Sequence, residues 1–157
     1  MMNWIRRNLL AVGLSLGFWR APASAGILND VSEASEKGAK ALNALGYKAD
    51  FKIESIRELE RFMKDNVETE GGAKVGGQLS EGMGNKLFLL GSYLGETIRR
   101  KIGGVWHGDD SDPEATINVE VVGPNESVIW PIQRIMKRFQ NGDEDDLWAY
   151  ALSVAGE

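Results

Sequence analysis

The sequence predicts a single α+β domain in which a small, mostly antiparallel sheet packs against helices. Amphipathic segments with helical spacing are interspersed with short runs in which apolar and polar residues alternate. Strands and helices do not alternate regularly enough for a doubly wound parallel sheet. A chain of 157 residues, 43% of them hydrophobic, is long enough for one core and too short for two domains.

The first 25 residues have the order of an export signal. A basic start is followed by an apolar run at 9–19 and by small residues up to Ala25. This run is shorter than the roughly 20 residues of a membrane-spanning helix. We therefore expect a signal peptide over 1–25, a mature domain over 26–157 with no stable membrane span, and a periplasmic or secreted location. The alternative is a cytoplasmic protein in which this segment is an N-terminal helix.

Five segments have the apolar stripe and the start or stop signals of amphipathic helices. Asp30 and Ser55 each begin a capping box, in which a polar side chain and an acid three residues later satisfy the first backbone N–H groups. Pro131 suits a first helical position, and Asp143 is the expected cap of the last helix. The expected helices cover residues 30–45, 55–67, 85–102, 131–141 and 143–154.

Four short runs have the alternation of strands, with β-branched and aromatic side chains on one face. The expected strands cover residues 47–53, 105–106, 116–122 and 127–130. The last three are close enough in sequence to form an antiparallel meander. Six glycines lie within 70–84, where their backbone entropy makes regular structure expensive, and we expect a mobile loop there.

Small and aromatic residues predict how the core packs. Gly91 and Gly95 lie one turn apart in the expected helix at 85–102, at a cost of ~1 kcal/mol each relative to alanine. We expect both to face another element at close range, because nothing else would offset that cost. Three aromatic side chains stand beside apolar neighbours and are expected in the core: Trp106, Trp130 and Trp148.

Composition excludes several classes of function. The formal charge is −5, and loss of the first 25 residues, with three arginines and no acid, takes it to −8. Such a charge repels nucleic acid and anionic lipid, and it favours solubility or a basic partner. Without cysteine there is no disulfide, thiol nucleophile or thiolate zinc site. The glycine-rich stretch at 82–86 lacks the spacing of a phosphate-binding loop, so no cofactor is expected.

The candidate site residues gather around His107, the only histidine. It precedes Asp109, Asp110 and Asp112 in an acidic turn at 109–114, and these side chains could form a metal site or an acid/base pair. The spacing does not supply the ligand positions of an EF-hand calcium loop. Turns also select aspartate and glycine for backbone reasons, so the other interpretation is a solvated hairpin tip.

The remaining charged motifs have structural explanations. The acidic run at 143–146 lies in the first turn of an expected helix, where the helix dipole stabilises negative charge. Glu96 lies three and four residues before Arg99 and Arg100, so we expect ion pairs within the helix. No serine, histidine and acid follow the pattern of a known nucleophilic triad.

Two motifs resemble a group of small bacterial proteins of uncharacterised function. One is YLGE, RR, GG and W at 93–106, and the other is WP, KR and NGDEDDLW at 130–148. The resemblance covers about the last 75 residues, a length that fits one domain-sized core. It implies an α+β domain built from a glycine-bearing helix, a small sheet and C-terminal helices, and it implies no catalytic residues.

These observations favour a non-enzymatic binding or accessory protein whose acidic surface meets a protein partner. The alternative is a metal-assisted or hydrolase-like enzyme that uses His107 and the acidic turn at 109–114.

Overall fold

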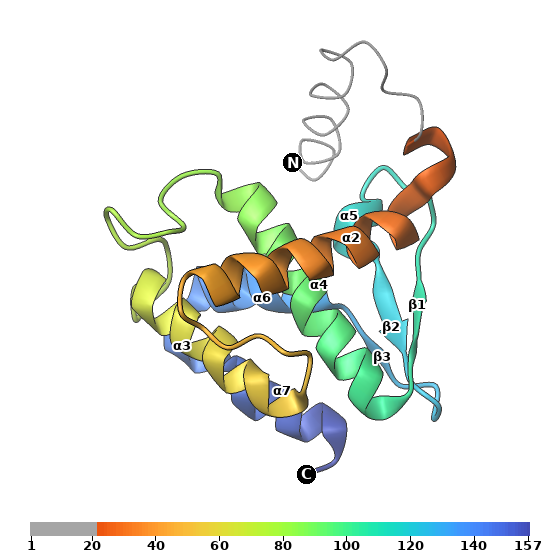
Figure 1. Cartoon of the computed structure of the whole chain (residues 1–157). Coiled ribbons are helices and arrows are strands. Elements are labelled where there is room, and N and C mark those ends of the chain that lie inside the picture. Colours follow the sequence, from red (N-terminus) through yellow and green to blue (C-terminus); the bar gives the residue numbers. More distant parts are fainter. Residues whose placement is uncertain (1–21) are drawn as a thin grey trace.

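Helix α4, Met83–Ile102, is the centre of the fold, and the other helices pack around it. The computed structural model describes residues 22–157. Figure 1 shows α2, Pro22–Ala44, crossing in front of α4, with α6, Pro131–Asn141, behind it. Almost every residue of α4 between Leu87 and Ile98 is buried, which confirms the expected central helix.

Helix α2 begins earlier than the sequence predicts. The expected start at Asp30 is wrong, because α2 runs from Pro22, with a break in helical geometry at Gly26 (φ 66°, ψ 180°). The backbone N–H of Ile27 donates to the carboxylate of Asp110 at 2.6 Å. A residue 83 positions along the chain therefore accepts the first N–H after the break, where the main part of α2 starts, and no local capping pattern can reveal this contact.

The expected strand at 47–53 is wrong. Residues 47–50 form no regular structure, and the end of the segment enters a short 3-10 helix, Ile53–Ser55, that leads into α3, Ile56–Asn66. The Asn43 amide side chain bonds both the N–H and the C=O of Ala49, so the backbone needs no neighbouring strand. The alternation is correct for burial, since Ala49 and Ile53 are in the core.

The glycine-rich segment between α3 and α4 contains neither helix nor regular strand, as expected. Its only ladder-like contact within the described chain is an isolated bridge between Val67 and Ala73. Val75 is fully exposed, whereas Leu79 is 1% exposed and packs into the core. The side chain of Asn66 accepts the N–H of Gln78 at 2.8 Å, which ties the segment to the end of α3.

Three short antiparallel strands confirm the expected meander. Strands β1, Val105–His107, β2, Glu120–Val122, and β3, Val128–Ile129, pair in the order β1-β2-β3. Figure 1 shows this sheet beyond α4, on the side of the molecule away from α3. One face carries the inward-pointing Trp106, Val121 and Ile129, which are neighbours in the register.

The first half of the expected strand at 116–122 is wrong, because it forms the short helix α5, Ala115–Asn118. The Asp112 carboxylate accepts the backbone N–H of Glu114 and the side-chain amide of Asn118. These local bonds favour a helical turn over the extended conformation that the β-branched residues prefer.

At the C-terminus, Pro131 occupies the start of α6 as expected. The expected cap at Asp143 is wrong: Gly142–Asp145 is a 3-10 turn, and Asp146 caps α7, Leu147–Ala155, by accepting the Ala149 N–H at 2.8 Å. None of the helices within residues 22–157 is both long and apolar enough to span a bilayer. The expected signal peptide lies almost wholly outside the described residues.

Candidate functional site

The acidic turn and the end of the sheet form an open groove of about 420 Å³. His107, at the end of β1, lines this groove together with Glu120, its cross-strand partner in β2. The turn between β1 and α5 contributes acidic side chains, and Leu28 of α2 closes one side. The complete lining is Leu28, Trp106, His107, Gly108, Asp109, Asp112, Ala115, Asn118 and Glu120.

Each carboxylate of the turn has a different partner. Asp109 accepts the N–H and the hydroxyl of Ser111, and these bonds lower the pKa of the Asp109 carboxyl. Asp110 bonds the start of α2 through Ile27, and Asp112 serves the start of α5. The turn is therefore held by its own acids, which act as backbone caps.

The structure brings His107, Asp109 and Asp112 to one groove and directs Asp110 to α2. Within residues 22–157, no group of three or more histidine, aspartate and glutamate side chains is arranged to hold a metal ion. Metal binding by the candidate residues around His107 stays a hypothesis. The groove places the His107 imidazole beside the carboxylates of Asp109, Asp112 and Glu120, and part of its lining is apolar.

The outer face of the sheet exposes apolar side chains that the sequence predictions missed. Val105, Val122 and Val128 form one row across the three strands in the register. Val105 is 58% exposed and Val128 is 36% exposed. The next row places His107 beside Glu120, so the groove and this face are continuous.

Trp130, two residues after Val128 of β3, is also exposed, so the expectation that it belongs to the core is wrong. It is 43% exposed, because the following residue, Pro131, is buried against Gly95 and starts α6 there. Trp106 is half-buried, as is Trp148, over which the guanidinium of Arg57 stacks at 4.5 Å. We call Val105, Val122, Val128 and Trp130 the outer sheet patch.

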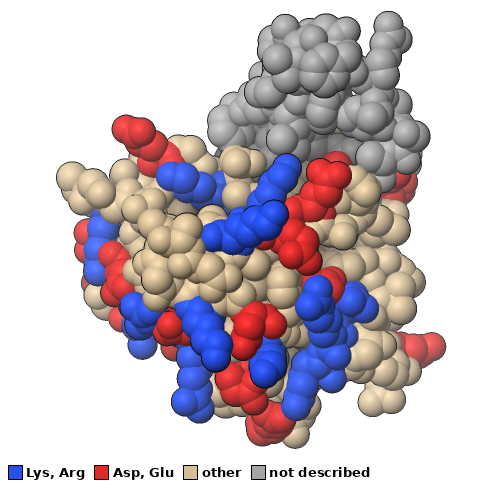
Figure 2. Space-filling view, in the orientation of Figure 1, with Lys and Arg blue, Asp and Glu red and all other residues tan. Residues whose placement is uncertain are grey.

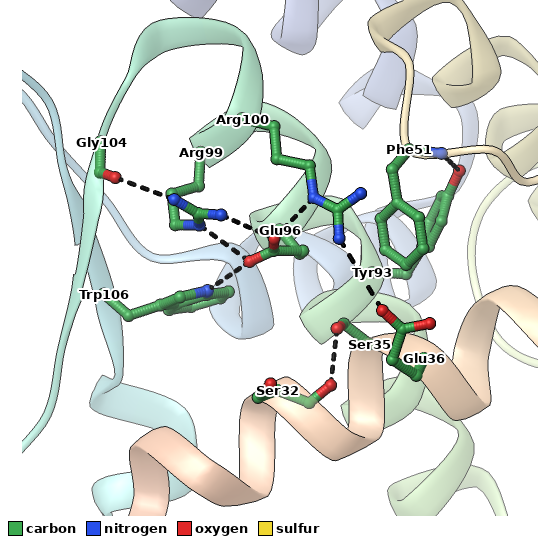
Figure 3. Close-up of polar contacts among 10 residues, drawn as sticks. All are labelled: Ser32, Ser35, Glu36, Phe51, Tyr93, Glu96, Arg99, Arg100, Gly104 and Trp106. Carbon is green, nitrogen blue, oxygen red and sulfur yellow. Dashed lines mark hydrogen bonds and ion pairs between the residues drawn. The ribbon is translucent and has the colours of Figure 1, made fainter.

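A second cluster centres on Glu96, whose expected pairs with Arg99 and Arg100 are confirmed (Figure 3). Glu96 also accepts the indole N–H of Trp106 at 3.0 Å, and Arg100 reaches Glu36 of α2 at 3.8 Å. Burial raises the pKa of Glu96, but the three donors outweigh burial and lower it to about 2. The cluster connects α4 to β1 and α2. Both carboxylate oxygens of Glu96 accept hydrogen bonds from side chains of the protein.

A buried ion pair, missed by sequence reasoning, joins α3 to α6. Arg138, which is fully buried, donates from Nε and Nη2 to the Glu60 carboxylate at 2.8–3.1 Å. Glu60 also accepts the Leu147 N–H at the start of α7. A signal existed, because each charge interrupts the apolar stripe of its helix and the two have opposite sign.

The surface charge is mixed where it can be seen. Figure 2 shows Lys and Arg side chains interspersed with Asp and Glu over the lower half of the face in view. The acidic excess therefore forms no continuous patch on that face. The acidic side chains Asp109 and Asp112 lie in the groove beside the sheet.

Comparison with known protein families, with curated proteins and with solved structures gives no match to this chain. The resemblance to a group of small bacterial proteins stays a prediction.

Proposed function

We propose that this protein is a non-enzymatic binding protein that recognises a protein partner through the outer sheet patch. The observation that carries the proposal is a row of valines, with Val105 58% exposed, on the solvent face of a three-stranded sheet. Apolar side chains gathered on one small surface are typical of interaction sites, whereas single exposed ones are not. Trp130, 43% exposed, supplies the kind of anchor that contributes most to binding energy.

The charges around the patch indicate the chemistry of the partner. Asp109, Asp112 and Glu120 line the groove at one end, and Glu126 is exposed in the turn between β2 and β3. A complementary surface has an apolar centre and lysine or arginine at its rim. The rim charges should govern the association rate and its salt dependence, while the patch should govern dissociation.

Site-specific cross-linking in the native host tests this proposal. A photoactivatable residue at Val105 or Trp130 should give adducts of one defined mass. The matched control position is Leu45. It is apolar and 45% exposed, but it lies just beyond the end of α2. Equal adducts at all three positions, or none at Val105 and Trp130, would refute a specific surface.

The second candidate function is a metal-assisted or hydrolase-like activity of the groove. It is favoured by one observation, the cross-strand placement of His107 beside Glu120 with Asp109 and Asp112 in the same groove. A ligand at a hundred times its dissociation constant stabilises a protein by about 2.7 kcal/mol. Thermal unfolding with calcium, zinc or manganese checks this, with His107→Ala as the control. Unchanged unfolding with all three ions would refute the metal-assisted version.

A further inference from the structure

Residues 26–28 of α2 and the acidic turn lie so close together that a side chain at Gly26 or Gly108 would clash with the other segment. A Cβ at Gly26 would clash with Asp110 Oδ2 and lie 2.9 Å from Oδ1. A Cβ at Gly108 would meet the side chains of Ile27, Val119 and Leu28. Two glycines on two segments thus bring the Asp110 carboxylate directly against Gly26 and the N–H of Ile27.

Gly26 is also the residue that would become the amino terminus if the expected export signal were removed after Ala25. We propose that cleavage at this bond creates a Gly26 ammonium group that binds the Asp110 carboxylate. Loss of the preceding peptide bond frees Gly26 to rotate about its Cα–C bond. The ammonium nitrogen can then take the position where a Cβ would clash, because a cation within hydrogen-bond distance of a carboxylate oxygen is attracted.

This pair joins the two sides of the groove. Leu28, two residues after Gly26, lines one side, while Asp109 and Asp112 flank Asp110 on the other. Removal of the signal would therefore break the Ala25–Gly26 peptide bond at the rim of the groove. The new Gly26 ammonium group would form an ion pair with Asp110 across the groove. The Gly26–Asp110 pair does not depend on whether the outer sheet patch binds a partner.

Other charged groups near the two segments are Asp30, one turn along α2, and Asp109, Asp112 and Glu114 of the turn. The carboxylate of Asp109 is engaged by Ser111, and that of Asp112 by the start of α5. Asp110 is the carboxylate that contacts the Gly26–Ile27 segment in the structure.

The test begins with the full chain produced in a bacterial host that exports it. Mass spectrometry of the exported protein should find Gly26 as the amino terminus. Intact Met1 or a terminus elsewhere would overturn the proposal. The Gly26 α-amino group is then titrated through its Cα resonance, and its pKa should lie above the ordinary value of about 7.7–8.0 because the Asp110 carboxylate favours the charged form.

Asp110→Asn separates the ion pair from simple helix capping. Asparagine keeps an oxygen that can accept the Ile27 N–H but removes the negative charge. The α-amino pKa should return to its ordinary range in Asp110→Asn and stay raised in the matched variant Asp109→Asn. The same α-amino pKa in the parent and in Asp110→Asn would overturn the proposal, because Asp110 would then be a cap only.

A pH series gives an independent readout. The ammonium has a raised pKa when folded, so the stability it adds is present below the ordinary α-amino pKa and is lost as pH rises through the folded value. The melting temperature of the exported parent should therefore fall more between pH 7 and pH 10 than that of Asp110→Asn. Parallel curves would contradict the ion pair.

Discussion

At the scale of single residues, the buried charges of this protein depend on partners from other elements. Glu96 pairs with Arg99 and Arg100 in its own helix, and its third donor, Trp106, lies in β1. Glu60 and Arg138 are 78 positions apart in the sequence. Helical spacing predicts the first kind of pair, because the partners are neighbours along the chain. It says nothing about the second kind.

Glu96 should make stability depend on acidic pH. Its folded-state pKa of about 2 lies below the ordinary value of 4.5, so the stabilisation is complete above the ordinary value and is lost as pH falls toward about 2. The effect amounts to at most about 3 kcal/mol. Urea unfolding from pH 7 to pH 2 should show Glu96→Gln less stable than the parent at pH 7, with the difference narrowing on acidification. Glu81→Gln, at an exposed position, is the control, and a constant difference for Glu96→Gln would contradict this account.

Glu60 should matter more to stability than any exposed acid of the same helix. Glu60→Gln leaves the fully buried Arg138 with only the largely exposed Asp143, at 3.2 Å, as an ionic partner, and loss of the buried partner typically costs about 3–5 kcal/mol. Glu58→Gln is the matched control in α3, because its pair with Arg61 is partly exposed and worth under about 1 kcal/mol. Chemical denaturation measures both, and similar losses would mean that the buried pair is not essential.

At the scale of elements, close approach between helices decides the arrangement. A Cβ at Gly91 would lie 3.0 Å from the backbone Cα of Ile132, and a Cβ at Gly38 would lie 2.6 Å from the carbonyl oxygen of Leu89. Glycines on α2 and α4 therefore allow the backbones of α2, α4 and α6 to pack closely against one another. The prediction that Gly91 and Gly95 face another element is confirmed, with α6 at Gly91 and both Trp106 and Pro131 at Gly95.

Gly95→Leu should overpack this contact, because even a Cβ there would lie 2.6 Å from the Pro131 ring. The expected loss is roughly 1–3 kcal/mol or more, relieved only by displacement of Trp106. Asn85→Leu, at an exposed position of the same helix, is the control and should change stability by less than about 0.5 kcal/mol. Thermal unfolding compares the two, and a Gly95→Leu variant that melts with the parent would show that the contact can open freely.

Local capping decides the elements where strand expectations are wrong. At 116–122 the alternation of β-branched residues predicts a strand, but Asp112 caps a helical turn over the first half. At 47–53 the side chain of Asn43 takes the place of a neighbouring strand. At 47–53 the alternation still marks which side chains are buried, since Ala49 and Ile53 are in the core. At 116–118 it does not, because the helical turn buries Thr116 and leaves Ile117 half-buried.

At the scale of the whole molecule, the described residues contain an extensive buried core. Two buried clusters meet on α4 and draw on every helix from α2 to α7. Among the α2 side chains from Gly26 onward, Ile27 is the first that is buried, and it lies immediately after the expected cleavage position. We therefore predict that residues 26–157 have enough buried apolar surface for a cooperative fold.

A chain starting at Gly26 should unfold in one transition with the cooperativity of the complete chain. The physical reason is that Ile27 and all later core residues are present in it. Circular dichroism and tryptophan fluorescence should report the same denaturation midpoint and slope for both chains. A shallower or earlier transition for the shorter chain would mean that residues upstream of Gly26 belong to the fold.

The sequence by itself determined the fold class, the central glycine-bearing helix, the meander and the pairing of Glu96 with its helical neighbours. Each of these depends on periodicity or on residues within a few positions, where local backbone geometry sets which side chains meet. Only the tertiary structure decided the Glu60–Arg138 pair, the contact of Asp110 with the start of α2, and the exposure of Trp130 on the outer sheet patch. These depend on which elements come together in space, because a charge or an aromatic ring is buried or exposed by neighbours distant in the chain.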